Sequence, residues 1–177
     1  MTVAMIARPQ PDEYAPYYGG YISRVPEGDL LALLAHQSSE TLALLRSIPE
    51  ARGAHRYAPG KWTVKDVVGH MCDTERIMSY RALRIARGDQ TPLQGFEQND
   101  YVPVAHFDRR TLADLGEELS AVRQATLHLF RHFDAEALVR RGTASGNPFT
   151  PRALGYVIAG HERHHVSILK DKYLGAG

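Results

Sequence analysis

The chain has 177 residues, of which 44% are hydrophobic and 23% are charged, enough for one hydrophobic core and too few for two domains of ordinary size. Its 21 basic and 20 acidic residues give a formal net charge of +1. Because proteins that bind nucleic acids or membranes usually carry a strong basic excess, this balance argues against both kinds of partner.

Cysteine content and hydropathy indicate the cellular compartment in which the protein works. The single cysteine, Cys72, excludes an intrachain disulfide and a cysteine-rich zinc site. The N-terminal segment lacks the apolar stretch of a signal peptide, and no stretch approaches the ~18 uninterrupted apolar residues of a membrane-spanning helix. We therefore expect a soluble protein of the reducing cytoplasm.

Residues 1–27 are predicted to form an extended N-terminal arm, and residues 28–177 a helical bundle domain. The arm holds four prolines and four of the nine tyrosines, and prolines at this density disfavour a continuous helix. Beyond it, leucines recur at three- and four-residue spacing as far as Ile48, which predicts a first long helix that ends at Pro49.

A second helix is predicted to begin at Thr63. Asp66 follows three residues later, which is a variant of the capping box with Asp in place of Glu or Gln. An apolar stripe then continues to Ile85, and Gly88 is a typical helix stop. Residues 89–110 contain two prolines and a glycine and predict a long loop, of the kind that is usually functional or packed over a site.

Two further helices complete the predicted fold. The same Thr-x-x-Asp pattern at Thr111 begins a third helix that continues to Phe133. Thr150 is a suitable N-cap and Pro151 a suitable first residue for a fourth helix, which stops near Gly175. The sequence shows no strand-like alternation. Four amphipathic helices of ~20 residues each predict an all-α four-helix bundle.

Two histidines interrupt the apolar stripe of the fourth helix. His161 and His165 are spaced i and i+4, so both rings project from one face and can converge on one metal ion. A lone histidine in a core is usually a hydrogen-bonded core residue. Two stacked on one apolar face would both need buried partners, which favours a metal site.

A third ligand is expected from another helix. His70 lies at the edge of the stripe of the second helix and is the only histidine within that helix. Three neutral imidazoles leave a fourth position for water or substrate, the arrangement of a catalytic zinc site. The alternatives for this third ligand are His36, His106, His128 and His132.

Two charged residues also point into apolar stripes. Glu75 projects near the centre of the stripe of the second helix, and Arg123 projects inward from the third. Since an unpaired buried charge costs several kcal/mol, we expect the two to pair across the bundle. The pair could bind a cofactor or substrate, or it could be purely structural.

Residues 161–165 also satisfy the H-E-x-x-H signature of zinc metalloproteases. That architecture needs a third ligand well downstream and a strand that holds the peptide, and neither is evident here. The motif nevertheless leaves Glu162 beside the metal face as a candidate general base.

Residues 60–76, GKWTVKDVVGHMCDTER, and residues 160–165, GHERHH, resemble the second-helix and fourth-helix signatures of the DinB/YfiT-like superfamily. The resemblance implies an up-down-down-up four-helix bundle with a three-histidine metal site, usually assigned to nickel or zinc. On that pattern the ligands are His70, His161 and His165. Homodimers are common among such proteins, so we expect a homodimer.

The resemblance implies several activities. Some relatives are thiol-dependent transferases or isomerases that use bacillithiol or mycothiol, and others are classed as metal-dependent hydrolases. We expect a metal-dependent enzyme with a small-molecule substrate, a thiol transferase ahead of a hydrolase, and a non-catalytic metal-binding dimerisation module as the third possibility. A hydrolase would use Glu162 or Glu75 as base, whereas a transferase would need cationic groups for the thiol, such as Arg81, Arg84 and Arg123.

Overall fold

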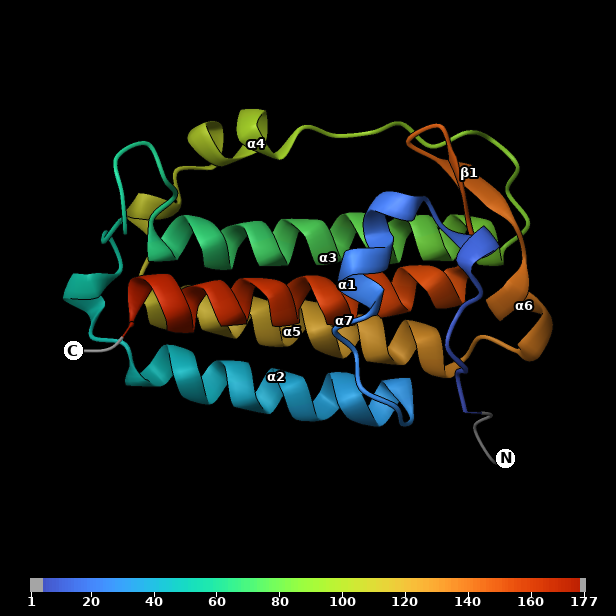
Figure 1. Ribbon diagram of the computed structural model, residues 1–177, viewed down its shortest axis with the longest axis horizontal. Helices are drawn as coiled ribbons and strands as arrows, with labels where there is room; N and C mark the ends of the chain where they lie inside the picture. The colour runs from blue at the N-terminus through green and yellow to red at the C-terminus, as the bar shows by residue number, and fades with distance from the viewer. Residues whose placement is uncertain (1–4, 176–177) are drawn as a thin grey trace.

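The computed structural model describes residues 5–175, and four long helices form its bundle. Helix α3 packs against α5 and α7, and α2 packs against the same two helices. Figure 1 shows that α2 and α7 run in one direction and α3 and α5 in the other, which confirms the predicted up-down-down-up bundle. The four helices are α2 (Leu30–Ser47), α3 (Val64–Ala86), α5 (Leu112–Arg131) and α7 (Pro151–Ile168).

Shorter helices and two short strands lie outside the four long helices. The arm contains two 3₁₀ turns and the one-turn helix α1, which packs against α7. None of the helices within residues 5–175 combines the length and the apolar character that crossing a membrane requires. The short helices and strands are α1 (Gly19–Ile22), α4 (Gln98–Ala105), α6 (Ala135–Val139), β1 (Gly142–Ala144) and β2 (Asn147–Phe149).

The structure corrects three details of the predicted elements. The predicted loop 89–110 contains α4, which is only eight residues long, includes Pro103 and packs against α3. Strands β1 and β2 form a hairpin whose three-residue strands are too short to show alternation. The fourth helix ends as a π-helical turn, Leu169–Tyr173. The ends of the predicted arm and bundle domain, residues 1–4 and 176–177, lie outside the described residues.

The predicted helix starts are confirmed. Thr63 and Asp66 form a reciprocal capping box, with each side chain accepting a hydrogen bond from the backbone of the other. The Thr150 hydroxyl accepts a hydrogen bond from the Ala153 amide, and Pro151 occupies the first position of α7. Such side chains satisfy amides that have no partner within the helix, so local sequence determines where α3 and α7 begin.

A polar layer divides the interior of the bundle. One apolar cluster lies at the end of the bundle where α2 and α7 begin, and a second lies at the end where α3 and α5 begin. Between them every long helix contributes buried polar residues, although burying such groups is costly unless they are paired. The members of this layer are Gln37, Ser38, Thr41, His70, Thr74, Glu75, Arg123, Thr126, His161, Glu162 and His165.

The N-terminal arm lies directly on α7 beside this layer. A Cβ atom added at Gly160 would lie 2.1 Å from the carbonyl oxygen of Tyr21. Only glycine at this position lets the backbone of the arm approach α7 so closely. The contact places α1 next to His161, the residue that follows Gly160.

A buried carboxylate anchors the start of the arm. Glu13 accepts hydrogen bonds from the Thr150 hydroxyl and the Arg152 guanidinium at the start of α7, and from the Gln10 amide. Burial raises the pKa of Glu13, but these hydrogen bonds and the charge of Arg152 outweigh it and lower the pKa from 4.5 to about 2. Glu13 therefore remains ionised when the chain is folded.

This anchor predicts a pH-dependent contribution to stability. Glutamate in the unfolded chain titrates near pH ~4.3, so the contribution of Glu13 is complete above that pH and is lost as the pH falls towards about 2. We expect Glu13→Gln to lower the melting temperature at neutral pH, and the difference from wild type to shrink as the pH falls below ~4. Melting curves read by circular dichroism measure this difference.

Glu27→Gln is the matched control, because its pair with Arg8 is exposed and should contribute little. A difference for Glu13→Gln that stays constant between neutral and acidic pH would contradict the anchor.

Candidate metal centre

Three buried histidines from α3 and α7 converge in the polar layer. The Nε2 atom of His161 lies 3.0 Å from Nε2 of His70 and 3.1 Å from Nε2 of His165. Ligand atoms of the three residues all lie within 4.8 Å of one another. Helices α3 and α7 are neighbours, so the i, i+4 pair on α7 faces the single histidine of α3. The structure thus brings the three predicted ligands together.

The protonation state of the three rings suits metal binding. Burial lowers the pKa of His70 to about 4, and burial together with neighbouring histidines lowers that of His165 to about 3. Burial, together with His165, His70 and His164, lowers the pKa of His161 well below its ordinary value. All three imidazoles are therefore neutral near pH ~7, the form that offers a lone pair to a metal ion.

Two of the three nitrogen–nitrogen separations fit a divalent ion. Each Nε2 atom lies within 3.1 Å of another imidazole nitrogen, and the Thr74 hydroxyl also lies 3.5 Å from Nε2 of His70. Two imidazole nitrogens bound to one tetrahedral zinc ion at ~2 Å lie about 3.3 Å apart, close to the separations of 3.0 and 3.1 Å in this cluster. A metal ion held by three nitrogen donors has a fourth coordination position for water or substrate. Metal binding itself stays a prediction.

Aromatic side chains enclose the cluster. The ring of Trp62, in the connection before α3, lies 4.8 Å from the ring of His70 and 6.4 Å from that of His165. The ring of Tyr21, in α1, lies 5.5 Å from that of His161. These contacts restrict the imidazole rings and shield them from water. Sequence patterns did not predict them, because Tyr21 belongs to the proline-rich arm and Trp62 precedes the helix start.

Arg123 and two carboxylates form a charged group in the same polar layer of the bundle. Arg123 donates two hydrogen bonds to Glu75, both 2.8 Å long, and a third of 2.7 Å to Glu162. Its Nη1 atom donates to the Leu34 carbonyl oxygen at 2.8 Å. Burial disfavours its charge, but the two carboxylates raise the pKa of Arg123 above its ordinary value. The guanidinium therefore stays charged between two buried carboxylates.

The predicted pairing of Glu75 with Arg123 is confirmed, and Glu162 joins it. Oε2 of Glu162 accepts hydrogen bonds from Arg123 and from the Gln37 amide, whereas its Oε1 atom has no hydrogen-bond partner among residues 5–175. Periodicity did not predict the contact between Gln37 and Glu162, because it depends on how α2 and α7 are rotated against each other. Ligand binding by Glu75 and Arg123 stays a prediction, and so does the role of Glu162 as a general base.

The model of the DinB superfamily matches residues 33–169. The chain belongs to the DinB superfamily. Among solved structures it is similar to YfiT from Bacillus subtilis, described as a probable metal-dependent hydrolase with an unusual four-helix bundle topology. The two chains share 15% sequence identity over 88% of this chain and 89% of YfiT, with a TM-score of 0.71. At this identity the likeness shows a shared fold. No curated protein matched the chain.

All three arginines predicted as thiol-binding candidates in this DinB-superfamily chain have protein partners, and those of Arg123 are Glu75, Glu162 and the Leu34 carbonyl oxygen. Arg81 is buried and donates to the Gln94 carbonyl oxygen at 2.8 Å and to Ser145 at 3.0 Å. Arg84 pairs with Asp89. Both side chains hold the α3–α5 connection against the bundle, which leaves them poorly placed to bind a free anion.

Cys72 is not suited to act as a nucleophile. It is completely buried in the second apolar cluster, and burial raises the pKa of its thiol. A thiolate nucleophile requires the opposite shift. This environment is that of a packed side chain and not of a nucleophile.

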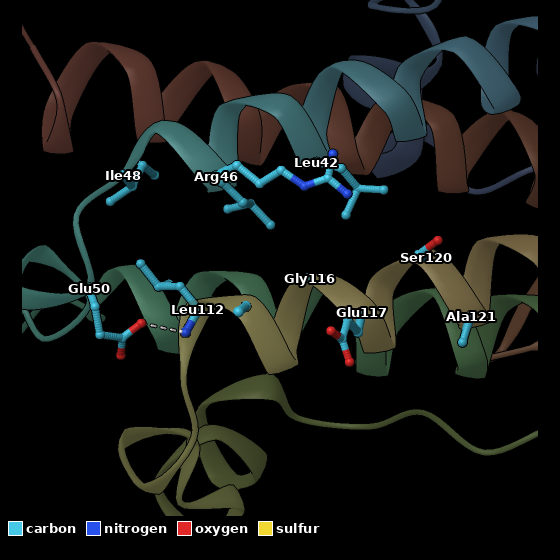
Figure 2. A pocket seen from close by; sticks show the side chains of 11 residues that line it. Leu42, Arg46, Ile48, Glu50, Leu112, Gly116, Glu117, Ser120 and Ala121 are labelled. Atoms are coloured by element: carbon cyan, nitrogen blue, oxygen red, sulfur yellow. Dashed lines mark hydrogen bonds between the residues drawn. The ribbon is translucent and has the colours of Figure 1, made fainter.

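Cavities open both at the cluster and away from it. Small pockets of about 200 and 240 Å³ reach His161 and His165 respectively. A groove of about 560 Å³ lies between α2 and α5, and Figure 2 shows Leu42 and Arg46 of α2 facing Gly116 and Glu117 of α5 across it. None of the predicted site residues lines this groove.

Proposed function

We propose that this chain binds one divalent transition-metal ion, nickel or zinc, through His70, His161 and His165. We further propose that it transfers a low-molecular-weight thiol such as bacillithiol or mycothiol to a small electrophile. The convergence of three buried, neutral imidazole nitrogens carries this proposal. Three nitrogen ligands leave room for a fourth ligand from solution, as catalytic sites do.

A bound divalent ion would lower the pKa of a thiol ligand, so that a nucleophilic thiolate exists at neutral pH. The protein supplies three uncharged donors at fixed positions, while Trp62 and Tyr21 restrict the access of water. In the transfer, a sulfur–carbon bond forms and the bond from carbon to the leaving group breaks. The leaving group departs with the bonding electrons, and the thiol proton passes to solvent.

The contacts of the acidic residues favour transfer over hydrolysis. The hydrolase alternative assigns the proton of the attacking water to Glu162 or Glu75 as base, but both carboxylates are bound to Arg123. A thiol transferase needs no such base, although the three arginines predicted to bind its thiol all have protein partners. One observation favours the hydrolase alternative, namely that the Oε1 atom of Glu162 has no hydrogen-bond partner among the described residues. The description of YfiT agrees with that alternative.

A direct assay separates the candidates. Zinc-loaded and nickel-loaded protein would be given bacillithiol or mycothiol with 1-chloro-2,4-dinitrobenzene, and separately p-nitrophenyl acetate without thiol. We expect metal-dependent formation of the thioether, lost in His161→Ala and retained in Cys72→Ala. Ester hydrolysis without thiol transfer would overturn the transferase and favour the hydrolase. Loaded protein inactive in both assays would favour a non-catalytic module, whose predicted homodimer can be measured by light scattering.

A further inference from the structure

Two separate pockets end at the histidine cluster, and no residue lines both of them. The first, here called the tyrosine pocket, measures about 200 Å³ and touches His161. The second, here called the tryptophan pocket, measures about 240 Å³ and touches His165. Since the Nε2 atoms of these histidines are 3.1 Å apart, ligands in the two pockets would meet at the cluster.

Aromatic rings and one carboxylate line the tyrosine pocket. The ring of Tyr17 stands at 85° to that of Tyr18 and at 80° to that of Tyr21, with centroids 5.1 and 5.9 Å apart. Phe96 adds a fourth ring, and Glu97 is the one acidic side chain among the described lining residues; its Oε1 atom accepts a hydrogen bond from the Asn99 amide at the start of α4. Rings set at right angles beside a carboxylate are the surroundings that bind organic cations through their π faces.

One of these rings already contacts a cation of the protein itself. The guanidinium carbon of Arg81 lies over the ring of Phe96, 5.7 Å from its centroid. The pocket therefore places the rings of three tyrosines and of Phe96 around the space that a cation would occupy. Glu97 is exposed, so the positive end of a ligand would lie at the mouth of the pocket, away from the metal ligands.

The tryptophan pocket is also lined by aromatic rings, but it has a basic side chain where the tyrosine pocket has an acidic one. The rings of Tyr57 and Tyr173 meet edge to face at a centroid distance of 4.9 Å, and Trp62 stands nearly parallel to His165, at 25°. Lys61 is the one lysine or arginine among the described residues that line it. Apolar rings beside an exposed ammonium group suit an organic anion such as an aromatic carboxylate.

We propose that the histidine cluster serves two organic ligands at once, a cation-bearing molecule in the tyrosine pocket and an anion-bearing molecule in the tryptophan pocket. This inference rests on the proposed function, because joining two molecules is useful at a metal centre that catalyses transfer between them. A hydrolase would need one organic ligand and water. The opposite charges at the two mouths assign each ligand to its own pocket.

Calorimetric titration with simple probes tests this assignment. Choline and its neutral isostere 3,3-dimethyl-1-butanol probe the tyrosine pocket, and benzoate and benzyl alcohol probe the tryptophan pocket, on metal-free and zinc-loaded protein. We expect choline to bind about fivefold more tightly than its isostere, and benzoate more tightly than benzyl alcohol. Saturating benzoate should change the Kd of choline by less than about twofold.

Exposed residues provide variants that should remain folded. Tyr17→Leu and Glu97→Gln should each weaken choline binding about fivefold or more and leave benzoate binding unchanged. Tyr17→Phe, which keeps the ring, should bind choline like wild type. Lys61→Gln should weaken benzoate binding alone, so the variants of the two pockets serve as controls for each other.

Three results would overturn the two-pocket proposal: no binding of either charged probe, equal binding of choline and its neutral isostere, or displacement of one charged probe by the other. Metal content, measured on the same samples, separates this proposal from the proposed function. Protein that binds zinc but not the probes refutes the pockets alone. Protein that binds both probes but no metal refutes the metal centre alone.

Discussion

Replacing any one of His70, His161 and His165 by alanine is expected to reduce bound metal from about one ion per chain to less than ~0.1. Each residue would supply one of only three protein ligands. Loss of a mere hydrogen-bond partner of a ligand already costs about 10- to 100-fold in metal affinity, so loss of a ligand should cost more. Plasma mass spectrometry on tag-free protein, after incubation with nickel or zinc, gives the metal content.

The matched control is His164→Ala. His164 lies beside His165 on α7 and its ring is 5.4 Å from that of Tyr21, yet it does not belong to the cluster. It should retain the metal of wild type, and circular dichroism should show that all four variants are helical. Wild type that takes up neither nickel nor zinc would falsify the metal centre and leave the three histidines as core residues.

The sequence predicted the long helices because they depend on local rules. The caps at Thr63 and Thr150 satisfy backbone amides within one turn, and the apolar stripes cover whole helices. Polar residues within those stripes also indicated the site, since His161, His165 and Glu75 occupy positions that an ordinary core would fill with apolar groups. These signals need only helical geometry, which the sequence specifies directly.

Other parts of the structure depend on contacts that no local rule encodes. Helix α4 is too short to show periodicity, and the hairpin turn requires positive φ angles at Ser145 and Gly146. The positions of Tyr21 and Trp62 against the histidines follow from the path of the arm and of the α2–α3 connection. Such long-range packing is decided by the whole bundle, so the sequence predicted the ligands but not the walls of their pockets.

Replacing Arg123 by methionine is expected to lower the free energy of unfolding by about 3–5 kcal/mol. The side chain is completely buried, and it is the one cation bound to the buried carboxylates of Glu75 and Glu162 among the described residues. Removing it leaves two like charges without a partner in the interior. Urea denaturation in the presence of a chelator measures the loss in metal-free protein, so that metal affinity does not contribute.

Arg76→Met is the surface control. Arg76 pairs with Glu118 on α5 but is half exposed, so its removal should cost less than about 1 kcal/mol. A triple variant, Arg123→Met with Glu75→Gln and Glu162→Gln, should recover part of the loss because it removes the unpaired charges along with the cation. Equal losses for Arg123→Met and Arg76→Met would contradict a buried ion pair. Recovery in the triple variant would show that uncompensated charge, and not lost packing, destabilises the single variant.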